Sequence, residues 1–434
     1  MQRSRNGRTN ERRHAPEPAP NRARQRAYVF GVAEEGDDLA ELKELLRTAG
    51  VATVGETVQH RDRPHPNVYL GPGKVDEVKA ALKAVDANLA VADDELTPRQ
   101  QRNLETELDV PVLDRTAVIL DIFAGHAHTA EGKLQVELAQ LEYNMARMRG
   151  LWTHLERLGA GRGVGGIGTR GPGEAQIETD RRLARDRISA LRRRLEHVKS
   201  TRSVMRAERE RAHLPTVALA GYTNAGKSTL LNAMTGAEVS VGDRLFHTLD
   251  PTTRTTRLEG RTYLMTDTVG FIRKLPHGLV DAFAATLEET IRADLVLHVV
   301  DGSATEDDLI SMMRAVEDVL EEIGAGDRPR LLVLNKVDAL GADERQALAF
   351  RHPDGSPVSA LTGEGLDALS DRIAAEFEKT LVNVELLVPF REGGLLSELH
   401  ELAGDLDRED TPDGVRVAVR LPRLVAARFE RFAA

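Results

Sequence analysis

The sequence contains no cysteine, and no run of about 18 or more apolar residues occurs along its 434 positions. Without cysteine the chain cannot form disulfide bonds, thiolate metal sites or a cysteine nucleophile, so oxygen and histidine atoms remain as metal ligands. The arginine-rich start is not followed by the apolar segment of a secretory signal. We therefore expect a cytoplasmic protein that has no membrane partner.

Length and composition predict several soluble domains. A chain of 434 residues exceeds one ordinary core, because a domain usually takes roughly 100 to 200 residues. The hydrophobic share of 41% and the charged share of 29% match those of soluble globular proteins.

The net charge of −10 is unevenly distributed along the chain. Residues 1–26 and 145–213 are strongly basic, and the second segment holds about nine more basic than acidic side chains. The acidic average alone would argue against a nucleic-acid partner. Because the charges are segregated, the basic segments can still bind RNA phosphates.

The first 115 residues divide into a tail and a small domain. Residues 1–26 hold few apolar side chains and several prolines, so we expect a disordered basic tail, either a solvated leader or an RNA-contacting arm. From 27 to 115, short apolar runs alternate with helical patterns, which indicates an α/β domain. Within it, Gly71 and Gly73 precede a helix, and we interpret them as a tight turn in preference to a phosphate-binding loop.

Residues 116–213 are predicted to form an antiparallel helical hairpin. Apolar residues at alternating spacings of four and three define a seam on each helix. The seams comprise Leu134, Leu138, Leu141, Met145, Met148, Trp152 and Leu155, and Ala184, Ile188, Leu191, Leu195 and Val198. Between them, residues 158–174 (LGAGRGVGGIGTRGPGE) are too rich in glycine to remain helical. This tip carries Arg162 and Arg170, and we interpret it as a contact for a phosphate backbone in preference to a plain linker.

Residues 214–383 contain four apolar strand patterns separated by helical or loop segments. They predict an α/β fold with a doubly wound, mainly parallel sheet. Residues 384–434 are expected to form a small αβ appendage, and they lack the GXXG loop of a KH-type RNA domain.

A phosphate-binding loop, the P-loop, follows the first of these strands. GYTNAGKST matches G-x-x-x-x-G-K-[ST] between an apolar strand and a helical pattern. Backbone amides would cradle the phosphates, Lys227 would bridge the β- and γ-phosphates, and Ser228 would bind Mg²⁺. The nucleotide-binding residues predicted here are Gly221, Tyr222, Thr223, Asn224, Ala225, Gly226, Lys227 and Ser228.

The motif DTVG lies at the end of a later strand and comprises Asp267, Thr268, Val269 and Gly270. Its carboxylate can hold the magnesium shell, and the Gly270 amide can sense a γ-phosphate.

The motif NKVD comprises Asn335, Lys336, Val337 and Asp338 and can read the base. Asp338 can accept both hydrogens that N1 and the 2-amino group of guanine offer, whereas adenine would leave this carboxylate unpaired. Asn335 can complete the purine contacts, and Lys336 can cover the base or brace the P-loop. In the later segment Ser359, Ala360 and Leu361, the Ala360 amide can meet the guanine oxygen. The order of the motifs predicts a G domain with GTP as substrate and GDP as product.

A switch loop is expected between the P-loop and DTVG. Its nucleotide-covering residues are Phe246, His247, Thr248, Leu249 and Asp250. Thr248 is the preferred magnesium ligand, with Thr252 and Thr253 as rivals. Together with Lys227 and Gly270, Thr248 completes the predicted catalytic set.

These motifs, together with YLGPGKVDEV, the GVGGIGTRGPGE tip and FHTLDPTTR, resemble the HflX family of ribosome-associated GTPases along nearly the whole chain after the tail. The resemblance implies a nucleotide-associated N-terminal domain, a hairpin that reaches the 50S ribosomal subunit and its rRNA, and switches that sense the ribosome. It also implies Thr248 as the magnesium threonine. Some members are thought to split stalled ribosomes, and this activity is carried over as an expectation.

Phe271 follows DTVG, at the position where Ras-like proteins place the glutamine that orients the attacking water. A phenyl ring cannot orient water by hydrogen bonding, so we expect slow GTP hydrolysis by the protein alone and faster hydrolysis on the ribosome. We also expect the protein to be a monomer. Asn224 is a candidate K⁺ ligand, as in similar potassium-assisted GTPases, or only packs within its loop.

Two other functions compete with a GTPase that docks on the ribosome. The first is a GTP-regulated RNA chaperone or ribosome-assembly factor without splitting activity. The second is a metabolic sensor that binds a nucleotide through residues 27–115.

Overall fold

A computed structural model describes residues 25–33, 38–147, 172–211, 214–236, 245–246, 251–259, 261–274, 276, 287–379, 381–403 and 406–433. The chain divides into two compact units, Met1–Asp121 and Ile122–Ala434. Most of the predicted tail and most of the predicted tip lie outside the described residues. The described helices are too short or too polar to cross a membrane.

The first unit is built around a four-stranded parallel sheet with the strand order β2-β1-β3-β4. Its elements are β1 (Arg26–Ala33), α1 (Ala40–Ala49), β2 (Ala52–His60), α2 (Pro72–Ala84), β3 (Leu89–Ala92), α3 (Pro98–Leu108), β4 (Val112–Asp114) and the start of α4 (Arg115–His126). Alternating strands and helices are what the sequence predicts, because a parallel sheet needs crossover helices. The core is aliphatic and aromatic, with Phe30, Val78 and Leu104 among its fully buried members.

Local signals in this unit explain where its elements begin and end. Helix α1 ends at Gly50, whose φ of 76° is a left-handed conformation that glycine adopts without strain. Gly71 caps α2, and its amide donates to Gln59 Oε1 at 2.8 Å. The Gly-Pro-Gly segment is therefore a turn into a helix, as preferred above. Arg26 was assigned to the tail, which is wrong, because it opens β1 and donates to the carbonyl oxygen of Val85.

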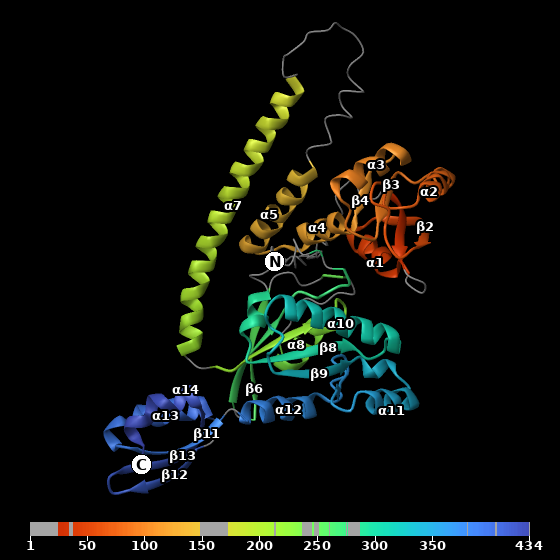
Figure 1. The fold of residues 1–434 in the computed structure, drawn as a ribbon. Helices are drawn as coiled ribbons and strands as arrows, with labels where there is room; N and C mark the ends of the chain where they lie inside the picture. Colours follow the sequence, from red (N-terminus) through yellow and green to blue (C-terminus); the bar gives the residue numbers. More distant parts are fainter. Residues whose placement is uncertain are drawn as a thin grey trace, which may run out of the picture. The chain divides into compact units, whose positions relative to one another are not determined.

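Two long helices follow at the start of the second unit, α5 (Ala130–Arg147) and α7 (Pro172–Arg211). Figure 1 shows α7 returning alongside α5 in the opposite direction. The predicted seams meet in one cluster of Leu134, Leu138, Ile188, Leu191 and Leu195, flanked by Leu141 and Met145.

Ion pairs add to the packing of the two helices. Arg187 contacts Glu137 at 2.6 Å, and Arg192 contacts Glu142 at 2.7 Å.

The next part of the second unit is a six-stranded sheet with the order β10-β9-β8-β5-β7-β6, in which only β6 pairs antiparallel. Its elements are β5 (Thr216–Gly221), α8 (Lys227–Thr235), β6 (Thr252–Leu258), β7 (Arg261–Asp267), β8 (Leu295–Asp301), α10 (Glu306–Glu322), β9 (Arg330–Asn335), the 3-10 helix η2 (Val337–Ala339), α11 (Ala342–Arg351), β10 (Ser356–Pro357) and α12 (Leu366–Glu378). Helices α8 and α12 pack into one core, and α10 and α11 into another. The predicted doubly wound sheet is confirmed.

The last part of the chain is a three-stranded antiparallel sheet with helices, in the strand order β11-β13-β12. Its elements are β11 (Leu381–Val388), the 3-10 helix η3 (Phe390–Glu392), α13 (Gly393–Ala403), β12 (Asp407–Thr411), β13 (Gly414–Pro422), α14 (Arg423–Ala426) and the 3-10 helix η4 (Ala427–Phe432). Strand β11 begins at Leu381, three positions before the predicted start of the appendage at 384.

Candidate nucleotide-binding site

The P-loop connects β5 to α8, next to the point where the sheet order reverses. In doubly wound sheets ligands bind at such a point, outside the carboxyl ends of the strands. A Cβ on Gly221 would lie 2.1 Å from the carbonyl oxygen of Val299, and one on Gly226 would lie 2.3 Å from Asn335 Nδ2. Both positions therefore require glycine for close approach of the backbone.

Lys227 begins α8 and is buried. Its Nζ donates to the carbonyl oxygens of Gly221 at 3.1 Å and Tyr222 at 2.9 Å. Burial lowers the pKa of Lys227 to about 8, although the nearby charge of Asp267 acts in the opposite direction. The ammonium group is thus held at the P-loop by backbone carbonyls.

Ser228 and Asp267 meet in the structure as the two motifs predict. The Ser228 hydroxyl donates to Asp267 Oδ2, and the carboxylate is completely buried at the end of β7. Beside it, the Thr268 hydroxyl donates to the carbonyl oxygen of Leu219 at 2.7 Å. A hydroxyl and a carboxylate oxygen in contact form the donor set that a hard cation such as Mg²⁺ prefers, so these residues fit the ion.

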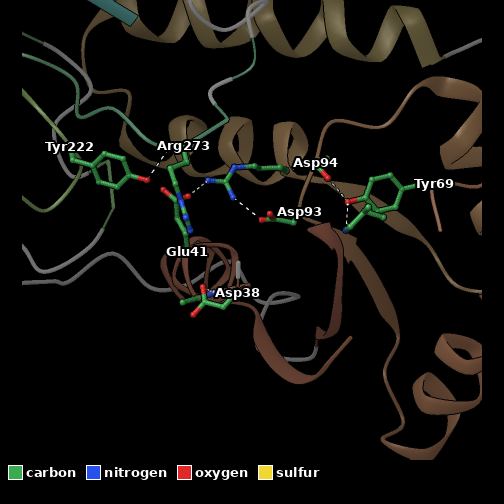
Figure 2. A network of polar contacts seen from close by, with 10 residues as sticks. Asp38, Glu41, Tyr69, Asp93, Asp94, Tyr222 and Arg273 are labelled. Atoms are coloured by element: carbon green, nitrogen blue, oxygen red, sulfur yellow. Dashed lines mark hydrogen bonds and ion pairs between the residues drawn. The ribbon is translucent and has the colours of Figure 1, made fainter. Parts of the chain in front are cut away.

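The segment after DTVG is joined to the P-loop by backbone hydrogen bonds. Phe271 donates its amide to the carbonyl oxygen of Gly221 at 3.1 Å and accepts from the Thr223 amide at 2.7 Å. Its side chain is 1% exposed. The Arg273 amide donates to the Tyr222 hydroxyl at 2.8 Å, a contact drawn in Figure 2. The position after DTVG therefore presents a buried ring, without a polar side-chain group.

The NKVD asparagine bridges two loops. Asn335 Nδ2 donates to the carbonyl oxygen of Ala225 at 2.8 Å, and its Oδ1 accepts from the Ala360 amide at 3.0 Å. Asn335 was expected to complete the purine contacts, and the Ala360 amide was expected to meet the guanine oxygen. These contacts with the base stay predictions. Lys336 pairs with Asp301 at 2.7 Å, and its expected contact with the base or the P-loop stays a prediction. Sequence reasoning missed Asp301, although its position at the end of β8, beside β9, was a usable signal.

Asp338 is held in place by a neighbouring hydroxyl. Ser359 Oγ donates to Asp338 Oδ1 at 2.6 Å and accepts from the Thr362 amide at 3.1 Å. Val337 is buried beneath this loop, whereas the Leu361 side chain is 78% exposed. The structure thus brings the predicted NKVD residues and the segment 359–361 together at the end of β9.

The switch loop is only partly described. Phe246 is buried and packs edge-on against Phe123, with ring centroids 4.6 Å apart. The rivals Thr252 and Thr253 lie in β6, where the Thr253 hydroxyl pairs with that of Thr266 at 3.0 Å. The other predicted switch residues, His247, Thr248, Leu249 and Asp250, lie outside the described residues.

The first unit contains a buried polar network that sequence reasoning did not find (Figure 2). Arg115 pairs with Glu41 and with Asp93, and the Arg115–Asp93 distance is 2.8 Å. Nearby, the Tyr69 hydroxyl donates to Asp94 and accepts from the Val32 amide. Burial, followed by the Asp94 charge, raises the pKa of Tyr69. The carboxylates of Glu41 in α1 and of Asp93 and Asp94 after β3 are thus engaged within the protein.

Four family models match consecutive segments of the chain. Their descriptions are GTP-binding GTPase N-terminal (residues 36–124), GTP-binding GTPase Middle Region (126–209), 50S ribosome-binding GTPase (216–336) and HflX C-terminal domain (348–433). A solved structure that the chain matches is that of a GTP-binding protein from Sulfolobus solfataricus in complex with GDP. It is 26% identical, covers 81% of this chain and 98% of that chain, and superposes with a TM-score of 0.40.

Curated relatives named GTPase HflX match most of the chain. The protein from Lacrimispora saccharolytica is 48% identical over 386 residues, which are 88% of this chain and 89% of the relative. The Escherichia coli protein is 45% identical over 400 residues, which are 91% and 92% of the two chains. Identity at this level over most of both chains, together with P-loop, DTVG and NKVD residues that meet at one sheet edge, shows that the chain belongs to the HflX family and is a GTPase.

Proposed function

We propose that this GTPase docks on the 50S ribosomal subunit through the surface of α7 and that docking accelerates GTP hydrolysis. The observation that carries the proposal is the charge of α7, which holds twelve basic and seven acidic residues over its 40 positions. Among them Arg182, Arg193 and Arg194 are exposed. A row of exposed arginines on a long helix suits the phosphate backbone of rRNA. The description of the matched G-domain model, a 50S ribosome-binding GTPase, agrees with this partner.

The proposed chemistry is in-line attack of water on the γ-phosphoryl group. Lys227 and the P-loop amides stabilise its negative charge, and Gly270 offers a further backbone amide. Ser228 and Thr248 are the residues that would hold Mg²⁺, with Asp267 beside Ser228. When bound, the ion would supply positive charge that offsets the negative charge of the phosphates. Asn224 remains the candidate ligand for K⁺.

Guanine recognition is assigned to Asp338. The Ser359 hydroxyl occupies Oδ1 of this carboxylate and thereby fixes its orientation. A carboxylate held in this way accepts the N1 and 2-amino hydrogens of guanine without a further loss of rotamer freedom. The contacts of Ala360 and Leu361 with the base are part of the same proposal.

Phe271 is the reason to expect slow hydrolysis without a partner. Its ring is buried and its backbone groups are bonded to the P-loop, so it cannot orient water. The ribosome is expected to supply the missing stabilisation by moving the switch segments.

Steady-state GTP turnover with purified ribosomal particles tests the proposal. The rate should rise several-fold with 50S subunits and fall to background in Lys227→Ala. Co-sedimentation with 30S, 50S and 70S particles, in GDP and in a non-hydrolysable GTP analogue, identifies the particle. Absence of both stimulation and co-sedimentation with every particle would contradict it.

Splitting of stalled ribosomes is a separate part of the proposal. Light scattering of 70S particles should fall after addition of the protein with GTP. Unchanged scattering despite tight 50S binding favours a GTP-regulated RNA chaperone or assembly factor instead. The Arg162→Ala, Arg170→Ala double variant tests whether the tip is part of the contact.

A further inference from the structure

Two residues of the P-loop, Thr223 and Lys227, lie beside the DTVG glycine. A Cβ built on Gly270 would lie 2.8 Å from both Cα and Cγ2 of Thr223 and 3.0 Å from Lys227 Nζ. The amide of Thr223 donates to the carbonyl oxygen of Phe271 at 2.7 Å, which fixes the position of this P-loop residue. The Thr223 side chain therefore lies beside both the P-loop lysine and the glycine expected to sense the γ-phosphate.

Thr223 carries a buried hydroxyl whose hydrogen-bonding capacity is not used. The residue is 6% exposed, and Oγ1 has no hydrogen-bond partner among the described residues. Leaving a hydroxyl buried and unpaired costs about 1–3 kcal/mol, and most buried side-chain polar atoms in folded proteins are paired. A bound ligand that accepts a hydrogen bond from the Thr223 hydroxyl would remove this cost.

The neighbouring side-chain donors are already engaged. The Ser228 hydroxyl bonds to Asp267, and the Thr268 hydroxyl bonds to the carbonyl oxygen of Leu219. Phe271 has no polar group to offer. Thr223 is therefore a side-chain donor that the P-loop leaves available beside Lys227 and Gly270.

We propose that Thr223 is a catalytic residue whose hydroxyl donates a hydrogen bond to the γ-phosphoryl group as water attacks. A rotation of about 120° about χ1 moves Oγ1 to the place of Cγ2 and moves Cγ2 to the place of the Cβ hydrogen, because threonine side chains occupy staggered rotamers. The hydroxyl can thereby take the place of Cγ2, next to Gly270 and Lys227. This inference rests on the GTP hydrolysis proposed for the same site.

Thr223 does not change its own protonation state in this step. The water oxygen forms a bond to the γ-phosphorus while the bond from phosphorus to the β,γ-bridging oxygen breaks. GDP leaves with the electron pair. One proton of water moves to another oxygen of the released phosphate, and the second proton stays on the oxygen that attacked. The Thr223 hydrogen bond stabilises charge on the equatorial oxygens.

Three variants of the full chain test the inference. Thr223→Val keeps the shape and removes the hydroxyl, Thr223→Ser keeps the hydroxyl, and Thr235→Val is the matched control. Thr235 lies at the other end of α8, where its hydroxyl donates to the carbonyl oxygen of Leu231. GTP turnover is measured with and without 50S subunits, together with the affinity for GDP alone and for GDP with aluminium fluoride, which mimics the transition state.

We expect Thr223→Val to lower kcat roughly ten- to a hundredfold, the range of one hydrogen bond to a charged group. Its GDP affinity should stay within about threefold, whereas the affinity gained with aluminium fluoride should be lost. Thr223→Ser should restore most of the lost rate. Because removing an unpaired hydroxyl does not weaken the fold, Thr223→Val should melt no lower than the wild-type protein.

Two results would overturn the assignment. One is a Thr223→Val protein that hydrolyses GTP at the wild-type rate, and the other is a Thr223→Ser protein as slow as Thr223→Val. If the wild-type protein itself neither binds nor hydrolyses GTP, the proposed function fails instead, so the two failures are distinguishable.

Discussion

A single histidine interrupts the aliphatic strand β8. His298 is 4% exposed, and its Nε2 has no hydrogen-bond partner among the described residues. Burial, followed by the positive charge of Arg330, lowers the pKa of His298 to about 4. The ring is therefore neutral in the folded protein and becomes charged only after unfolding, once the pH falls below its ordinary value of about 6.5.

This histidine should make the fold sensitive to acid. Between about pH 6.5 and pH 4 the unfolded chain binds one more proton than the folded chain, so the free energy of unfolding falls with falling pH. The full effect is about 3 kcal/mol. His298→Leu should remove this part of the pH dependence in urea unfolding, whereas His197→Leu, at an exposed position of α7, should not. Equal pH profiles for wild type and His298→Leu would contradict the assignment.

Lys227 predicts a pH dependence of nucleotide binding. With a pKa of about 8 in the free protein, the ammonium group loses its proton as the pH rises through this value. A bound phosphate favours the charged form and raises the pKa again. Affinity for GDP should therefore fall above about pH 8, by up to tenfold per pH unit, with uptake of a proton on binding.

The control for this titration is Lys227→Arg, because a guanidinium stays charged at these pH values. Its affinity for GDP should be weaker at neutral pH and should not fall further up to about pH 9. Calorimetric titration in two buffers of different ionisation enthalpy measures the proton uptake. If GDP affinity declines equally in the wild-type protein and in Lys227→Arg, the group that titrates belongs to the nucleotide and is not Lys227.

The structure brings together the described residues of the P-loop, DTVG and NKVD motifs, whereas the gathering of the switch residues around them stays a prediction. Lys227, Ser228 and Asp267 lie together as expected from a P-loop and a DTVG segment. The individual bonds of Asn335 and Lys336 could not be predicted. Their partners, Ala225 and Asp301, come from other strands and loops, and only the folded sheet brings them close.

At the scale of elements, Asn335 fastens the P-loop to the loop that follows β10. One side chain satisfies a carbonyl oxygen of the first loop and an amide of the second. Asn335→Ala would leave both buried backbone groups unpaired, at a cost of about 1–3 kcal/mol each. We expect a lower melting temperature and at least a tenfold loss of GDP affinity, measured by thermal unfolding and by titration.

A matched substitution separates this bridging from a general effect of removing an asparagine. Asn103 also donates from its side chain to a backbone carbonyl, that of Asn67, but at an exposed position. Asn103→Ala should leave the melting temperature and GDP affinity nearly unchanged. If Asn335→Ala behaves in the same way, Asn335 is not the brace that its two hydrogen bonds indicate.

Strands with apolar runs were predictable from the sequence, whereas the antiparallel edge strand β6 was not. The segment LVLHVVD corresponds to all of β8, because a strand buried on both faces reads as a continuous apolar run. Strand β6 reads TTRTTRL, and its threonines were considered as metal ligands of a loop. It pairs antiparallel with β7 at the edge of the sheet, where one face is open and apolar residues are not required.

Charge is unevenly distributed over the whole molecule. An overall charge of −10 repels rRNA, so 50S binding must rest on local basic surfaces such as that of α7. Arg187 and Arg192 of this helix are engaged in ion pairs with α5, whereas Arg193 and Arg194 are exposed on the same helix. The proposed docking therefore assigns phosphate contacts to Arg193 and Arg194.

Replacing both of these arginines by glutamine should weaken 50S co-sedimentation and flatten its salt dependence. Each phosphate contact contributes about 0.7–0.9 to the slope of log K against log salt concentration, so the slope should decrease by up to about 1.8. GTP turnover without ribosomes should not change, because α7 lies outside the nucleotide site. Arg328→Gln with Arg330→Gln removes the same charge from exposed positions of the G domain. If this control pair lowers the salt slope as much as the α7 pair, the attraction depends on net charge and α7 is not the docking surface.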